Sequence, residues 1–196
     1  MTSRWREIAV AGHTGDAVAA RAALTDNDPV ARELGLGALL RLGALTDADL
    51  DNALLDAAPS VRRRAALIAA QRPGVSLRGV LRDPDVTVAE AAVWACGEHE
   101  VVDDDVLETL IELGVASGDA LVREACAAAL GAIGDARGLA TILHACTDKP
   151  AVRRRAVLAL APFDGPEVEA ALQAALSDRD WQVRQAAEDI VRASND

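Results

Sequence analysis

Arginine and aspartate recur at fixed places along this chain, and they are the residues most suited to chemistry by type and spacing. The arginines lie one residue after a repeated valine or its equivalent: Arg32, Arg62, Arg123, Arg153 and Arg184. The aspartates lie three residues before it: Asp28, Asp85, Asp119 and Asp180. A feature shared by the repeats is better explained by architecture than by catalysis. An aspartate can cap its own helix, and a guanidinium can hold a carboxylate or carbonyl of the next repeat with two hydrogen bonds.

The other metal-ligating or nucleophilic residues form no recognisable site. Three cysteines occur at spacings that fit no zinc motif: Cys96, Cys126 and Cys146. We interpret them as small buried hydrophobes. Three histidines have no ligand partner in view: His13, His99 and His144. No phosphate-binding loop and no serine–histidine–aspartate arrangement is present. We therefore expect no catalytic residue, no cofactor and no metal site, although an enzymatic role stays open.

An acidic segment runs from Glu98 to Asp105. Its oxygens could bind a cation, but it lacks the glycine and the alternating ligands of an EF-hand loop. Asp103 to Asp105 stand at the start of an expected helix, where they could act as cap and as partners of the helix dipole. We favour that structural interpretation.

The elements that carry these residues are copies of one pattern, V-R-x-x-A-x-x-x-L-G. The clearest copy begins at Val122, and others begin at Val61, Val88, Val152 and Val183. Weaker copies begin at Ala31 and Trp5. A period near 30 residues is typical of helical solenoids, in which stacked helix pairs bury a continuous core. Each pair reads as a first helix (A) and a second helix (B) that carries the pattern.

Composition supports an all-α chain. Alanine and leucine, which favour helices, dominate the 196 residues, and the abundance of Ala, Asp, Gly and Arg suggests a GC-rich bacterial genome. Asp and Pro mark the expected B-helix starts, and Gly marks helix ends. We expect B helices at 3–12, 29–42, 60–71, 86–97, 119–132, 150–161 and 180–193. We expect A helices at 16–25, 47–57, 75–82, 103–116, 136–147 and 165–176.

The net charge of −11 opposes binding to phosphate backbones, which argues against nucleic acid as a partner. No apolar run approaches the roughly 20 residues that span a bilayer, and the first residues lack a signal-peptide core. We expect a cytoplasmic protein that does not bind membranes. Its oligomeric state cannot be inferred from the sequence.

The copies resemble HEAT-type repeats, in the subclass called phycobilisome-lyase HEAT-like. Two junctions match its glycine–aspartate signature, Gly131 to Asp135 and Gly12 to Asp16. The resemblance covers essentially the whole chain and implies a single array over residues 1–196. It implies an all-α, right-handed α-solenoid of about six HEAT-like helix pairs plus an N-terminal half repeat.

Function is open at this stage. The leading hypothesis is a non-catalytic scaffold or adaptor that binds another protein or peptide segment on its concave face. The resemblance also implies a lyase-like subunit that handles a chromophore or other ligand. A third option is a HEAT-like nucleic-acid-binding protein or glycosylase. His99-Glu100 resembles the dyads of deoxyhypusine hydroxylase, but that di-iron family needs several dyads and this chain has one.

Helical phase indicates which side of each B helix could bind a partner. Positions 0, +4, +7 and +8 from the valine fall on one apolar side, and +2 and +6 fall on the opposite side. Large apolar groups at +6 and arginines at +2 would then be exposed on the concave face. Trp and Arg are enriched in binding hot spots. We therefore predict a partner-binding strip made of Arg63, Leu67, Trp94, Arg154 and Leu158.

Overall fold

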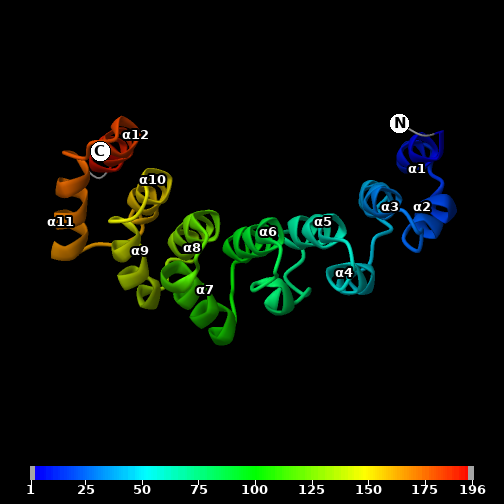
Figure 1. Ribbon diagram of the computed structural model, residues 1–196, viewed down its shortest axis with the longest axis horizontal. Coiled ribbons are helices and arrows are strands. Elements are labelled where there is room, and N and C mark those ends of the chain that lie inside the picture. The colour runs from blue at the N-terminus through cyan, green and yellow to red at the C-terminus, as the bar shows by residue number, and fades with distance from the viewer. Residues whose placement is uncertain (1–2, 194–196) are drawn as a thin grey trace. The chain divides into compact units, whose positions relative to one another are not determined.

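A computed structural model describes residues 3–193, and every regular element in that range is helical. The prediction of an all-α repeat fold is confirmed: Figure 1 shows the helices following one another in pairs. The B helices are α1 (Ser3–Thr14), α3 (Pro29–Arg41), α5 (Pro59–Ala69), α6 (Val86–Gly97), α8 (Ala120–Ile133), α10 (Pro150–Ala159) and α12 (Trp181–Ala193). The A helices are α2 (Ala17–Ala23), α4 (Asp47–Leu54), α7 (Asp104–Ala116), α9 (Leu139–Ala145) and α11 (Pro166–Ala175), with short 3-10 turns η1 (Arg78–Val80) and η2 (Ala136–Gly138).

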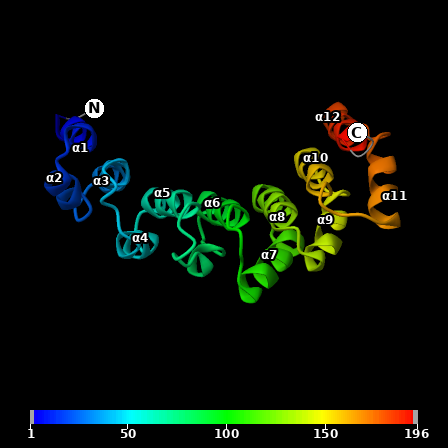
Figure 2. The same ribbon diagram turned by 180° about the vertical axis from the view of Figure 1, so that it is seen from behind.

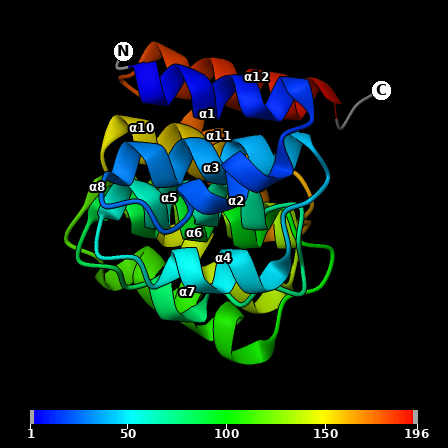
Figure 3. The same ribbon diagram turned by 90° about the vertical axis from the view of Figure 1, so that its right-hand side faces the viewer.

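The chain divides into two compact units, and the boundary falls inside α6, after Ala92. In unit 1, α1 packs on α3 and α3 on α5, so the B helices form one layer. Figure 3 shows α1 and α3 running side by side. The A helices α2 and α4 pack on α3 and α5 respectively. Helix pairs of this kind bury apolar surface against their neighbours, as expected of stacked repeats.

Unit 2 has the same two layers. The B helices α8, α10 and α12 pack in series, and the A helices α7, α9 and α11 do the same, as Figure 2 shows from behind. A cluster of small and branched residues forms the core of the last pairs. It contains Val157, Ala175, Val183, Ala186 and Ala187.

The predicted phase of the B helices is correct. Residues at positions 0, +4, +7 and +8 are buried in the repeats that begin at Val61, Val88, Val122 and Val152. Position +4 is small and fully buried in five repeats: Ala65, Ala92, Cys126, Ala156 and Ala187 have 0% exposure. Small residues here let successive B helices approach closely.

Two glycines show how close that approach is. A Cβ added to Gly131 would lie 2.7 Å from the Cα of Ala159. A Cβ added to Gly97 would lie 2.8 Å from the Cα of Ala129. The repeat therefore uses glycine at its end for close packing of the backbones as well as for termination.

One predicted helix is absent. An A helix was expected over 75–82, but the structure has only the turn η1 between α5 and α6. Pro73 and Gly74 precede it and Gly79 lies within it, and both residue types disfavour helix continuation. Val75, Leu77 and Leu81 are nevertheless buried, so this segment supplies core without forming a regular helix.

The first repeat begins two residues earlier than predicted. The copy placed at Trp5 would leave Ala11 on the exposed side, yet Ala11 is 3% exposed. A Cβ on Gly12 would lie 2.8 Å from the Cα of Ala38, so Gly12 is the counterpart of Gly97 and Gly131. That register makes Arg4 the counterpart of the repeat arginine, and Arg4 forms an ion pair with Asp26.

The cysteines behave as expected from their positions. All three are free, Cys96 and Cys126 are buried, and Cys146 is half-buried. Burial raises the pKa of the Cys96 and Cys126 thiols to about 12 and that of Cys146 to about 11. None is therefore a thiolate at neutral pH. Among the described residues, no helix has the length and apolar character needed to span a bilayer.

Candidate interaction surface

The repeat arginines and the aspartates of the following loops form what we call the Arg–Asp ladder. Its four pairs are Arg32–Asp56, Arg62–Asp83, Arg123–Asp148 and Arg153–Asp178. In each pair the arginine Nε and one terminal nitrogen donate to the two carboxylate oxygens at 2.6–2.9 Å. The other terminal nitrogen donates to a carbonyl of the loop before its own helix. Every guanidinium nitrogen thus donates a hydrogen bond, and two of the three join the helix to the following loop.

The ladder lowers the pKa of its carboxylates. The hydrogen bond from Arg123 holds the pKa of Asp148 at about 2, below its usual value. Arg62 and Arg153 lower the pKa of Asp83 and Asp178 in the same way. The structural interpretation of the repeated arginines is therefore confirmed, and none of these four is available to bind a partner.

The aspartates three residues before the repeat valine act as the predicted caps. Their side chains accept hydrogen bonds from the backbone N–H two residues on, at 2.8–3.0 Å: Asp28, Asp85, Asp119 and Asp180. The expected cap at Asp103 is wrong, since its side chain makes no such bond at the start of α7. Asp104 and Asp105 do lie in the first turn of α7, where a negative charge suits the helix dipole.

Two residues of the predicted strip, Arg63 and Leu67, line one hollow in unit 1. The hollow has a volume of about 640 Å³ and lies over the first turns of α3, α5 and α6. A second hollow, of about 270 Å³, lies over α1, α3 and α5 and shares Glu33 and Arg64 with the first. We call the two together the B-face groove. Arg63 is exposed as expected, whereas Leu67 was expected to be exposed and is half-buried.

The other three strip residues lie in unit 2. Trp94 is 40% exposed, and Arg154 is also exposed. Leu158 was expected to be exposed but is half-buried, because it packs against the core cluster that includes Val183. The reason is that the small residues of this cluster bring the neighbouring helix close. Within unit 2, Trp94 and Arg154 are thus the accessible members of the strip.

Arg41 and Arg64 also line the B-face groove, although neither belongs to the predicted strip. Neither they nor Arg63 makes a hydrogen bond or ion pair with residues 3–193. The start of α5 without a side-chain cap was not predicted either: Ala58 stands where α3 has Asp28 and α6 has Asp85. The signal was in the sequence: the repeats that begin at Val61 and Val152 carry three arginines and lack the aspartate three residues before the valine.

Comparison with known families gives one match. A model of HEAT repeats matches residues 76–161 and 142–189, which together make up more than half of the chain. No curated protein matches by sequence.

Solved structures show the same fold at low identity. The Escherichia coli protein YibA superposes with a TM-score of 0.67 at 18% identity, over 95% of this chain and 73% of that one. A designed armadillo repeat protein, solved with the peptide (KR)4, gives a TM-score of 0.59 at 18% identity over 97% of each chain. Human deoxyhypusine hydroxylase gives 0.50 at 21% identity, over 96% of this chain and 78% of that one. Among the residues described here, no group of three or more His, Cys, Asp or Glu is placed to hold a metal ion.

Proposed function

The chain belongs to the HEAT repeat family, and from this premise we propose that it is a non-catalytic scaffold or adaptor for another protein or peptide segment. The partner would bind the side of the B helices that faces away from the A helices, the concave face in a solenoid. Its contacts would include Arg63, Leu67, Trp94, Arg154 and Leu158. The proposal includes neither nucleic acid nor membrane as a partner.

A contrast between neighbouring positions carries this proposal. The arginine at position +1 is held by the ladder in the repeats that begin at Val61 and Val152. The arginine at +2, Arg63 or Arg154, is exposed and makes no ion pair within the described part of the chain. Next to it on the same helix face, +6 is a large apolar residue. That residue is Leu67 or Leu158, and both are half-buried; the exposed aromatic group of the strip, Trp94, lies at +6 of the repeat that begins at Val88. Arginine and tryptophan are the side chains enriched in binding hot spots.

Site-specific photo-crosslinking tests the proposal. A photoreactive amino acid would replace Leu67 or Trp94 on the B helices, and a control would carry it at Leu55, which is 83% exposed at the end of an A helix. We expect a discrete crosslinked protein from Leu67 and Trp94 in cells of the native organism, and none from Leu55. Equal labelling from all three sites, or crosslinks from Leu55 only, would contradict a B-helix binding surface.

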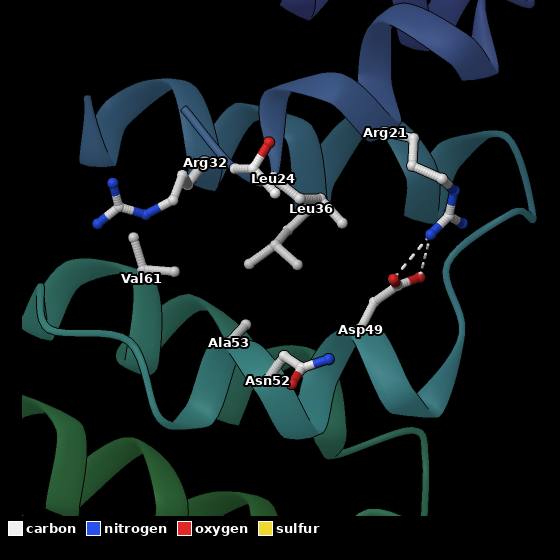
Figure 4. A pocket seen from close by; sticks show the side chains of 9 residues that line it. Arg21, Leu24, Arg32, Leu36, Asp49, Asn52, Ala53 and Val61 are labelled. Atoms are coloured by element: carbon white, nitrogen blue, oxygen red, sulfur yellow. Dashed lines mark hydrogen bonds and ion pairs between the residues drawn. The ribbon is translucent and has the colours of Figure 1, made fainter. Parts of the chain in front are cut away.

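A second candidate function, a ligand- or chromophore-handling subunit, is favoured by one observation. A cavity of about 290 Å³ lies between α2 and α4, with Leu24, Leu36 and Ala53 in its walls. Figure 4 shows Arg21 and Asp49 facing each other among the lining residues, and Arg21 donates to both carboxylate oxygens of Asp49 at 2.7 and 2.9 Å. This volume is at the low end for small-molecule pockets. Titration with an apolar fluorescent probe, with Ala53→Leu to fill the cavity, would separate this function from scaffolding.

A further inference from the structure

The B helices α5 and α10 differ from α3, α6, α8 and α12 in the chemistry of their first turn. No side chain caps α5 or α10, where Ala58 and Lys149 stand at the N-cap. In α3 the same place is taken by Asp28, whose carboxylate accepts from the Val30 N–H. The backbone of Ala58 (φ −87°, ψ 122°) matches that of Asp28 (φ −84°, ψ 117°). The first turn of α5 is therefore shaped to receive a carboxylate that its own sequence does not supply.

Three guanidinium groups without ion-pair partners surround this turn and the adjoining groove. Arg63 and Arg64 line the larger hollow, and Arg41 and Arg64 line the smaller. Gly37 leaves room for one of them, since a Cβ there would lie 3.3 Å from a terminal nitrogen of Arg64. In unit 2 the counterpart of Arg64 is Arg155, which faces Glu124 at 3.9 Å. The unit 1 arginines are thus the less neutralised set.

Two carboxylates face the same groove, and one of them is already engaged. Asp85 accepts hydrogen bonds from both the backbone N–H and the hydroxyl of Thr87. Glu33 makes no ion pair among the described residues and lies in the lining shared by the two hollows. With three free arginines against these two acids, the groove is locally cationic. Leu67 and Leu34 add apolar surface to its lining.

We propose that the B-face groove of unit 1 binds an acidic peptide segment of a partner protein, an inference that rests on the scaffold function proposed above. One carboxylate of the segment takes the place at the first turn of α5 that Asp28 occupies in α3. Further carboxylates pair with Arg63 and Arg64, and an apolar side chain of the segment lies against Leu67. Charge-assisted hydrogen bonds to a helix terminus and to guanidinium groups are the shared chemistry.

The groove favours carboxylates over a phosphate backbone for two reasons. The chain itself places carboxylates at the equivalent first turns of α3, α6, α8 and α12. A continuous polyphosphate would also have to pass Glu33, in a protein whose net charge is −11. A peptide can place a neutral residue opposite Glu33 and keep its acids for the arginines.

Fluorescence polarisation with labelled peptides on the full chain tests the proposal. The probes are a peptide of about nine residues that alternates glutamates with leucines, its glutamine counterpart, a lysine counterpart and a single-stranded oligonucleotide of similar length. We expect saturable binding of the glutamate peptide alone, weakened by added salt. Preferential binding of the oligonucleotide, or equal binding of the glutamine peptide, would overturn the proposal.

Two variants locate the site. Arg63→Gln combined with Arg64→Gln should weaken binding of the acidic peptide by about tenfold, from the loss of two partly exposed ion pairs. Arg179→Gln combined with Arg192→Gln removes the same charge from unit 2 and should leave binding within about twofold. If both double variants weaken binding equally, the attraction is a general charge effect and the proposed site is wrong.

Ala58→Asp separates binding from folding. The new side chain supplies the missing cap from within the chain, so melting temperature should rise by about 2–4 °C. It also occupies the place proposed for the partner's carboxylate, so affinity for the acidic peptide should fall by about fivefold or more. A stabilised protein that binds the peptide unchanged would overturn the proposal. If the peptide fails to bind while Leu67 still crosslinks to a partner, the acidic chemistry is wrong and the scaffold function stands.

Discussion

The two units share one layer and differ in the other. Each unit contains two of the four Arg–Asp pairs of the ladder, and all four pairs have the same bidentate geometry. Among the A helices, α7 packs on α9 and α9 on α11 in unit 2, whereas in unit 1 a cavity lies between α2 and α4. The third A helix of unit 1 is replaced by the turn η1. The B layer therefore sets the repeat, and the A layer can vary around it.

The two units also differ in their net charge. Unit 1 has eleven basic and twelve acidic residues, and unit 2 has nine basic and nineteen acidic residues. The ladder has the same geometry in both units despite their different charge. It therefore depends on local geometry and not on the overall electrostatic field of the unit. The excess acid of unit 2 lies elsewhere, including the segment from Glu98 to Asp105. The nearly balanced charge of unit 1 is what allows its unpaired arginines to form a cationic groove.

Breaking one Arg–Asp pair should cause the largest loss of unfolding free energy, and a similar loss in either unit. Arg62→Met or Arg153→Met leaves a largely buried carboxylate without its partner, and we expect a loss of about 2–4 kcal/mol of unfolding free energy. Denaturant titration followed by circular dichroism measures it. The control Arg72→Met breaks the more exposed pair with Asp47 and should lose less than about 1 kcal/mol. A large loss in one unit only would show that the ladders are not equivalent.

The second largest loss of stability is expected from overpacking the seam, the contact at position +4 where successive B helices meet. Ala65 in unit 1 and Ala156 in unit 2 are both fully buried at position +4, and leucine at either position should destabilise by about 1–3 kcal/mol. Thermal melting of the two variants checks it. An unchanged melting temperature for Ala156→Leu would mean that the seam yields more readily than its glycine contacts indicate.

The residues at position +4 show which features of the fold could be predicted from the sequence. Helical phase identified the buried positions because a 3.6-residue period fixes which side of a helix faces the core. The ladder arginines were assigned correctly, but their aspartate partners lie 21–25 residues further on and were not identified. Distances between repeats depend on how the loops fold, which periodicity does not report. The exposure of Leu158 was overestimated for the same reason, since packing between helices covers it.

Acid should weaken the Arg–Asp pairs of both units. The carboxylates of Asp83, Asp148 and Asp178 have a lower pKa folded than unfolded, so the unfolded chain binds protons first as pH falls. Their stabilisation is complete above about pH 4 and is lost as pH falls from there through about 2, the folded pKa of Asp148. Asp148 alone should account for about 2 kcal/mol. Denaturant titrations between pH 6 and pH 2 measure it, and Asp148→Asn should flatten the acid limb.

The A layers should differ in how well they tolerate added volume. A Cβ on Gly114 of α7 would lie 2.5 Å from the Thr141 Cγ2 of α9, so Gly114→Ala should destabilise unit 2 by about 1 kcal/mol. In unit 1, Ala53→Leu can place its side chain in the cavity beside α2 and should change stability by less than about 1 kcal/mol in either direction. Calorimetric melting compares the two. Equal destabilisation would mean that the cavity closes around Ala53 in solution.

The smallest change in stability is expected for Trp94→Ala, a variant that should affect binding more than folding. Its neighbours Val93 and Ala95 are fully buried, whereas Trp94 is 40% exposed. Trp94→Ala should therefore shift the melting temperature only slightly, by about 2 °C or less. If this face binds the partner, the same variant should weaken the complex by about 2 kcal/mol or more, because a hot-spot tryptophan loses its contact area on truncation. Calorimetry and binding to the crosslinked partner give the two values, with Trp181→Ala, 65% exposed at the start of α12, as the matched control. A strongly destabilised protein that still binds its partner would place Trp94 in the core and the binding surface elsewhere.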